Sequence, residues 1–178
     1  MDVQMGDVQV TDLQPIGPSP SELETAILND GSCDRRGRFW CGSRASDLVS
    51  PAASLFRLDP DGRCRAMDDG FAVSNGIAWS PDNRTMYFAD SPTGSIFAYD
   101  FDLDSGEIGN RRLFATTTAL GGLPDGAAVD SAGCYWSALF GGGVVVRFDP
   151  DGRLIGTVPL PVKNPTMCAF GGDRLDVL

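Results

Sequence analysis

Three dipeptides place a polar side chain directly before a glycine: Asp30-Gly31, Asn75-Gly76 and Asp125-Gly126. A short apolar stretch follows each of them. Carboxylate and amide oxygens are hard ligands that suit calcium, magnesium or manganese. Two carboxylates and an amide gathered at one point would repel or stay unpaired unless a cation or a substrate lay between them. A single such dipeptide is more often only a turn, so a binding site is predicted only if the fold brings the three together.

The sequence contains no histidine. This excludes a Ser-His-Asp or Cys-His catalytic group and a mixed cysteine–histidine zinc site. The five cysteines are an odd number and include no Cys-x-x-Cys pair, which favours reduced thiols in a cytoplasmic protein. Any chemistry must therefore come from carboxylates, amides, basic residues or a bound metal.

Charge and hydropathy limit the partners of the chain. The net charge of −10 argues against nucleic-acid binding. No stretch of 18 consecutive apolar residues occurs, so no membrane span is expected. The first residues lack the basic and apolar regions of a signal peptide, which again favours the cytoplasm.

A repeat of about 45 residues indicates which elements position the polar dipeptides. Each dipeptide and its apolar stretch are followed by a turn and an aromatic pair, and then by a strand with a matching tripeptide. The aromatic pairs are Phe39-Trp40, Tyr87-Phe88 and Tyr135-Trp136, and the tripeptides are Arg57-Leu58-Asp59, Ala98-Tyr99-Asp100 and Arg147-Phe148-Asp149. A fourth short strand is plausible after the last turn, at 154–160. Four short strands per repeat, with almost no helical periodicity, predict the blades of an all-β propeller. A two-sheet sandwich is the rival fold, but it requires no such repeat.

Propeller geometry would bring the three dipeptides together. The innermost strand of each blade lines a central channel, and equivalent positions of successive blades form a ring. Asp30, Asn75 and Asp125 are expected directly before these inner strands, so their side chains should converge at one mouth of the channel.

The stretches "NDGSCDRRGRFWCGS", "SNGIAWSPDNRTMYFADSPTGSIFAYDFD" and "GLPDGAAVDSAGCYWSALFGGGVVVRFDPDGRL" resemble the regucalcin/gluconolactonase family, also called the senescence marker protein family. The resemblance runs from about residue 28 to the C-terminus. It implies a six-bladed β-propeller that holds one divalent cation (calcium, magnesium, manganese, zinc or iron). The implied activity is the hydrolysis of sugar lactones.

The resemblance also assigns roles to individual residues. Asn75 and Asp125 correspond to metal ligands, and Asp125 corresponds to the general base as well. Asn29 corresponds to a substrate-binding residue, and Asp47 aligns approximately with an acidic residue that contacts substrate. Asp30 is a possible accessory ligand.

The chain departs from the family pattern at two positions. The family's remaining metal ligand is a glutamate in a "GESP"-like motif near the beginning of the chain. No such motif is present, and Glu22 has different neighbours. An arginine that often stands two residues before the first asparagine is Ile27 here. Arg44 could contact substrate, although an exposed loop arginine is more often only solvated.

We expect a poorly patterned segment at 1–27 and a partial propeller of three to four blades at 28–178. Such a fragment would leave open sheet edges, which favour self-association. The predicted function is a metal-dependent sugar lactonase, inactive if the fragment lacks the first ligand. The alternative is a non-catalytic propeller that binds calcium or a protein.

Overall fold

Residues 26–178, which the computed structural model describes, form three four-stranded antiparallel sheets. The first sheet contains β1 (Ile27–Cys33), β2 (Phe39–Arg44), β3 (Ala53–Leu58) and β4 (Cys64–Phe71). The second contains β5 (Ser74–Trp79), β6 (Thr85–Asp90), β7 (Ser95–Phe101) and β8 (Ile108–Thr116). The third contains β9 (Leu123–Val129), β10 (Tyr135–Phe140), β11 (Val144–Phe148) and β12 (Leu154–Pro159). The expected four-stranded blades with almost no helix are therefore confirmed for the described chain, in which η1 (Ser91–Thr93) is a single 3-10 turn.

Neighbouring strands within each sheet are neighbours in sequence, so tight turns join them. The two Asp-Pro-Asp-Gly-Arg turns show why the sequence turns where it does. Gly62 and Gly152 have φ angles of 83° and 81°, a left-handed conformation that favours glycine. In the second turn, the Asp149 carboxylate accepts hydrogen bonds from the backbone N–H groups of Asp151 and Arg153. These local interactions fix the length of each hairpin loop.

The second sheet is buried on both faces, so successive side chains along its strands belong alternately to two apolar clusters. Along β6, Met86 and Phe88 belong to the apolar cluster shared with the first sheet. Tyr87 and Ala89, which point the opposite way, belong to the cluster shared with the third sheet. Successive residues of a strand face opposite sides, so one strand contributes to two cores.

Two tryptophans contribute to the packing between the first and second sheets. Trp40 of the first sheet lies edge-on to Trp79 of the second, with ring centroids 6.2 Å apart. Trp136 packs instead against Phe170, which follows the third sheet.

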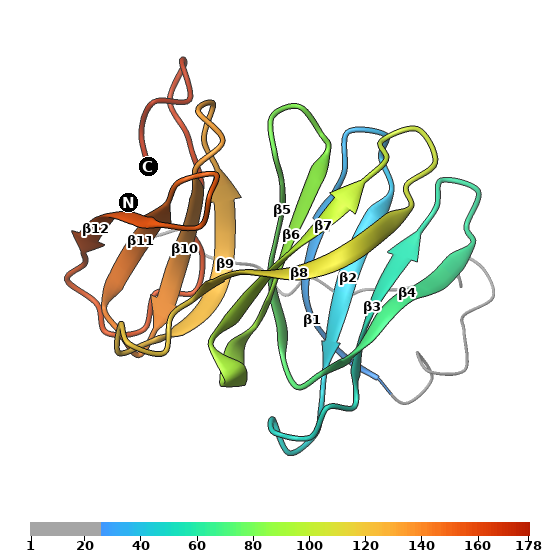
Figure 1. Cartoon of the computed structure of the whole chain (residues 1–178), viewed down its shortest axis with the longest axis horizontal. Coiled ribbons are helices and arrows are strands. Elements are labelled where there is room, and N and C mark those ends of the chain that lie inside the picture. Colours follow the sequence, from blue (N-terminus) through green and yellow to red (C-terminus); the bar gives the residue numbers. More distant parts are fainter. Residues whose placement is uncertain (1–25) are drawn as a thin grey trace, which may run out of the picture.

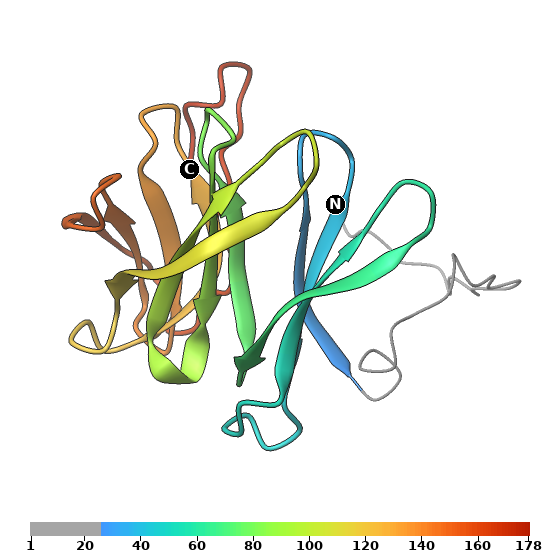
Figure 2. The same ribbon diagram turned by 45° about the vertical axis from the view of Figure 1, so that its right-hand side comes forward.

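Figures 1 and 2 show the three sheets side by side, with the second sheet in the middle. The first strand of each sheet lies on the inner side of the assembly, and β5 contacts both β1 and β9. Three segments that are far apart in sequence thus become neighbours in space.

Candidate functional site

The three polar dipeptides lie within the inner strands β1, β5 and β9 rather than directly before them. In each strand the pairing register shifts around the dipeptide, between Leu28 and Gly31, between Asn75 and Ala78, and opposite the Ser137–Leu139 segment of β10. Such bulges re-aim side chains next to functional sites. The expectation of a position before the strand is thus corrected, because the strands pair up to and beyond the irregularity.

Gly76 shows why one of these dipeptides requires glycine. Its φ angle is 60°, and a Cβ atom there would lie 2.2 Å from the hydroxyl of Tyr135 and 3.1 Å from the carbonyl oxygen of Asp125. The close approach of β5 to the third sheet therefore depends on the absent side chain. This approach places Asn75 and Asp125 against one another.

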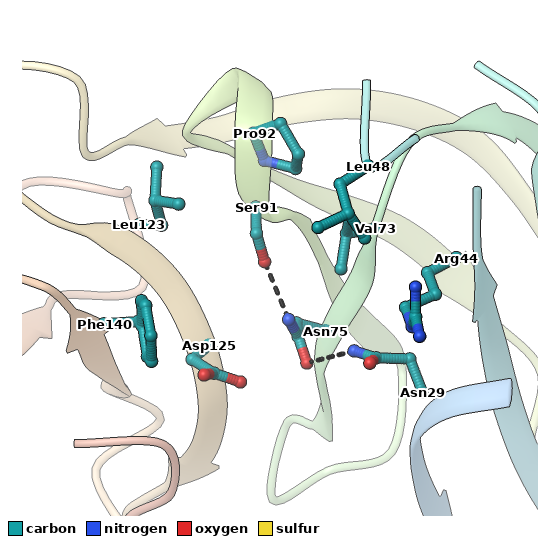
Figure 3. Close-up of a pocket in the computed structure, with 10 residues that line it drawn as sticks. All are labelled: Asn29, Arg44, Leu48, Val73, Asn75, Ser91, Pro92, Leu123, Asp125 and Phe140. Carbon is teal, nitrogen blue, oxygen red and sulfur yellow. Dashed lines mark hydrogen bonds between the residues drawn. The ribbon is translucent and has the colours of Figure 1, made fainter. Parts of the chain in front are cut away.

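Ser91 fixes the orientation of the Asn75 amide. Its Oγ lies 2.6 Å from the carbonyl oxygen of Pro124, which can only accept, so the hydroxyl proton is donated there. Ser91 Oγ must then accept from Nδ2 of Asn75, 2.7 Å away. Asn29 agrees with this assignment, since its Nδ2 donates to Oδ1 of Asn75 at 3.0 Å and to the carbonyl oxygen of Ser74 at 2.9 Å (Figure 3).

The buried amide of Asn75 therefore turns its oxygen toward other oxygens. Its Oδ1 lies 3.1 Å from Oδ1 of Asp125 and 3.2 Å from the carbonyl oxygen of Ser74. The reversed amide could donate to Asp125, but it would set its nitrogen 3.0 Å from the amide nitrogen of Asn29. When Asp125 is ionised, no proton lies between its carboxylate and the Asn75 oxygen. We call these acceptors and the Ser74 carbonyl oxygen the acceptor cluster, and a cation would satisfy them.

Burial raises the pKa of the Asp125 carboxyl, and the charge of nearby Asp30 raises that pKa further. The backbone N–H of Gly126 acts in the opposite direction but does not outweigh them. Loss of water and a like charge both penalise the ionised form. A cation at the acceptor cluster would reverse this penalty.

Asp30 lies near the cluster but faces the backbone. Its carboxylate accepts a hydrogen bond from the N–H of Gly31 at 2.8 Å and from the N–H of Ile77 at 3.3 Å. The second bond joins β1 to β5, so this side chain ties two sheets together beside the site.

Asp47 is placed differently. Its exposed carboxylate accepts hydrogen bonds from the backbone N–H groups of Val49 and Ser50 and from the Ser50 hydroxyl. The Ser50 hydroxyl is the largest of the causes that lower the pKa of Asp47 to about 2. Leu48, rather than Asp47, lines the pocket beside Asn75.

A pocket of about 480 Å³ opens over the acceptor cluster, as Figure 3 shows. Asn29, Asn75, Ser91 and Asp125 supply polar groups, and among the described residues Arg44 is the one cationic side chain in the lining. Apolar side chains supply the remaining wall: Leu48, Val73, Pro92, Leu123 and Phe140. A few polar groups within an apolar wall are typical of a small-molecule site.

Two residues of the site had no signal in the sequence. Ser91 stands in a Ser-Pro-Thr segment that has the appearance of an ordinary turn. Tyr135 belongs to an aromatic pair whose equivalent Tyr87-Phe88 packs between sheets. Neither side chain shares a position with the polar dipeptides, so the repeat could not identify them.

The oxygen atoms of the acceptor cluster are of the kind that binds a hard cation. Two oxygens about 3.1 Å apart suit ligands of one calcium ion, whose bonds to oxygen are about 2.3–2.6 Å long. Within residues 26–178, however, no three histidine, cysteine or carboxylate side chains gather as a metal-binding group. Asp125 would supply the charge, with Asn75 and carbonyl oxygens as neutral ligands. Glu22, which has the wrong neighbours for the family glutamate, lies outside the described residues.

Comparison with known proteins decides the family. The sequence profile of the SMP-30/Gluconolactonase/LRE-like region matches residues 2–178. The chain belongs to this family. The match begins before residue 28, where the recognisable motifs start, and continues to the last residue.

Relatives within the SMP-30/gluconolactonase family include named lactonases. The chain is 42% identical to a 6-deoxy-6-sulfogluconolactonase of Pseudomonas putida over 164 residues, which are 92% of this chain and 56% of that protein. It is 38% identical to a pentonolactonase of Haloferax volcanii, over 85% of this chain and 51% of that protein. Among solved structures, it matches a calcium-binding regucalcin from Agrobacterium tumefaciens with a TM-score of 0.78 and 30% identity, over 83% of this chain and 50% of that one.

The chain spans about half the length of these members of the SMP-30/gluconolactonase family. Its three sheets correspond to part of a regucalcin-type propeller. Among residues 26–178 there is no helix long and apolar enough to cross a membrane.

Proposed function

We propose that this protein is the sugar-lactone-hydrolysing part of a divalent-cation-dependent lactonase, with its site at the acceptor cluster of Asn75 and Asp125. The observation that carries the proposal is the 3.1 Å approach of the Asn75 amide, oriented by Ser91, to the Asp125 carboxyl group in the floor of a pocket. The lactonases among its relatives support the reaction class.

Asn75, Asp125 and the Ser74 carbonyl would hold the cation. When bound, it would supply positive charge to the lactone carbonyl oxygen as negative charge develops there. Ser91 and Asn29 hold the Asn75 amide in the orientation that this requires. Asp30 supports the site by joining β1 to β5.

Asp125 is the general base in this proposal. Water adds to the lactone carbonyl carbon while a carboxylate oxygen of Asp125 accepts a proton from it. The ring C–O bond then breaks, and the proton passes to the leaving alkoxide to give the open-chain sugar acid. A raised pKa brings this carboxylate closer to the operating pH than an exposed aspartate, which favours proton transfer.

Asn29 and the loop after β2 would hold the sugar. Within the described residues, Oδ1 of Asn29 accepts no hydrogen bond, so it is available to a sugar hydroxyl. Asp47 would act indirectly, by ordering the 47–50 turn that presents Leu48 to the pocket.

Two measurements test the proposal: calorimetric titration of the chelator-treated protein with calcium or manganese, and hydrolysis of gluconolactone with and without that ion. Asp125→Asn should abolish both cation binding and hydrolysis, because it removes the charged ligand and the base. The matched control is Asp61→Asn, in an exposed turn outside the pocket, which should change neither.

Turnover that survives chelation or the Asp125→Asn change would contradict the proposal. Cation binding by the wild-type chain without hydrolysis of any sugar lactone would instead support the non-catalytic alternative.

A further inference from the structure

Arg44 is a half-buried cation that faces the pocket and has no partner in the described chain. It is the last residue of β2, so the expectation of an exposed loop arginine is corrected. A backbone bridge to Val73 anchors it there. Ten other arginines pair with a carboxylate, whereas within residues 26–178 Arg44 makes no ion pair and no side-chain hydrogen bond. Arg44 therefore places a positive charge with no carboxylate partner at the pocket of Asn75 and Asp125, in a protein with a net charge of −10.

The register of β1 and β2 explains how the guanidinium reaches the pocket. Arg44 pairs directly with Ile27, the position at which the family resemblance leads us to expect an arginine. Side chains directly opposite one another in an antiparallel pair lie on the same face, with Cβ atoms about 5 Å apart. The positive charge is thus carried by β2 instead of β1, on the face where Asn29 lines the same pocket.

Arg44 takes no part in the proton transfers that we assign to Asp125. No ion pair joins the two, and Figure 3 shows them on opposite sides of the Asn75 amide. An arginine stays protonated at all ordinary pH values, so it cannot exchange protons with the reacting groups. What it offers is a planar fork of N–H donors that matches a carboxylate, sulfonate or phosphate.

We propose that Arg44 makes this pocket selective for sugar lactones that carry an anionic substituent away from the reacting carbonyl. This inference rests on the proposed function and names the substrate class of that same site. A neutral lactone leaves the guanidinium without a partner, whereas an anionic substituent replaces its water with two charge-assisted hydrogen bonds. The guanidinium also offsets the repulsion that an anion meets on approaching an acidic protein.

The test compares three lactones at saturating cation: neutral gluconolactone, carboxylate-bearing glucarolactone and 6-phosphogluconolactone. The wild-type protein should hydrolyse at least one anionic lactone with a KM about tenfold or more below that for gluconolactone. Arg44→Met should remove this advantage, because it should raise the KM for the anionic lactone about tenfold more than the KM for gluconolactone. Arg44→Lys should retain only part of the advantage, because an ammonium lacks the bidentate fork. Which anionic lactone is preferred identifies the substituent.

Two further variants sharpen the result. Ile27→Arg combined with Arg44→Ile moves the charge back to β1 and should restore anionic selectivity. Arg84→Met is the matched control, since Arg84 is also without an ion pair in the described residues but lies in an exposed turn outside the pocket. It should leave selectivity unchanged.

The inference is overturned if Arg44→Met affects neutral and anionic lactones equally, or if it lowers kcat for gluconolactone, which would place Arg44 at the oxyanion. If the wild-type protein hydrolyses no lactone, the proposed function fails on its own. Calorimetry with 6-phosphogluconate against gluconate then judges Arg44 separately. Tighter binding of the phosphorylated acid, lost in Arg44→Met, supports the inference, and equal binding of the two acids overturns it.

Discussion

The hydroxyl of Tyr135 donates a hydrogen bond to the carbonyl oxygen of Gly76 at 2.9 Å, and it joins the third sheet to the bulge of β5. The Tyr135 side chain is fully buried, and burial raises its pKa well above the ordinary value, with the charge of Asp30 as a further cause. The phenol therefore stays protonated and remains a donor. Because Gly76 follows Asn75 directly, this bond holds the backbone that carries the candidate ligand.

Tyr135→Phe should destabilise the fold by about 1 kcal/mol, because the change leaves a buried carbonyl without its donor. It should also weaken cation binding several-fold through the loosened bulge. Urea unfolding and calorimetry measure the two effects. The control is Tyr87→Phe, since Tyr87 packs against Tyr135 but its hydroxyl has no hydrogen-bond partner in the described residues. Equal effects of the two substitutions would show that the Gly76 bond is unimportant.

Asp125→Asn should make the cation-free protein more stable near neutral pH. The pKa of Asp125 is higher in the folded protein than in the unfolded chain. The folded protein therefore loses stability as the pH rises from the unfolded pKa through the folded pKa, and this loss of stability persists at higher pH. The asparagine amide of the variant is uncharged at every pH, so it causes no such loss of stability. The advantage of the variant should vanish below about pH 3.8, where both forms are uncharged.

Urea midpoints with chelator at about pH 7 and pH 3 measure this difference. Added calcium should reverse the order at pH 7, because only the wild-type site binds it. A variant that is less stable than wild type at neutral pH without cation would argue that Asp125 is already compensated within the protein.

Asp34→Asn, unlike Asp125→Asn, should make the protein less stable near neutral pH. Burial raises the pKa of Asp34, but hydrogen bonds from Trp40 Nε1, Arg38 and the backbone outweigh it, so the net pKa is lowered. The substitution leaves the Arg38 guanidinium without its ion pair at 2.6 Å and should cost about 3 kcal/mol. The contribution of Asp34 is present above its unfolded pKa and is lost as the pH falls through the lowered native pKa.

Chemical denaturation from about pH 7 to pH 2 checks this prediction. Asp100→Asn is a suitable control, because Asp100 pairs with Arg112 at an exposed position, where an ion pair contributes little. A loss of stability that does not depend on pH would mean that packing, rather than charge, is responsible.

Leu48→Asn should keep or raise stability while it weakens lactone binding. Leu48 has a φ angle of 60°, a left-handed conformation that costs a leucine about 1–2 kcal/mol and that asparagine tolerates better. The side chain is 47% exposed, so little burial is lost. Its removal from the apolar wall should raise KM. Val49→Asn, at the next and more exposed position, should change neither quantity, and a large loss of stability in Leu48→Asn would contradict the strain argument.

The blades were predictable because their signals are local. Turn residues, aromatic pairs and a matching tripeptide recur at about the same spacing in all three repeats. The approach of Asn75 to Asp125 followed from the repeat combined with propeller geometry. Asp30, the third residue of that prediction, turns to the backbone instead, and Asn29 was indicated only by the family resemblance.

The remaining details depend on contacts that spacing does not encode. The bulges depend on how each inner strand pairs with its neighbour, so the dipeptides were expected before the strands. Ser91 orients Asn75 only because the third sheet brings the Pro124 carbonyl to it. Asp47 was assigned by alignment alone, and its oxygens accept hydrogen bonds from its own turn.

Asn29, Asn75 and Asp125 each stand on a different sheet, and within residues 26–178 no continuous strand pairing joins these sheets. The affinity of the site is therefore a property of how the sheets dock. A substitution in an inter-sheet core could leave every hairpin intact, with an unchanged circular dichroism spectrum, and still abolish binding. Conversely, any ligand that contacts all three residues would act as a clamp and raise the cooperativity of unfolding. The slope of a denaturation curve, compared with and without ligand, would report the mutual docking of the blades.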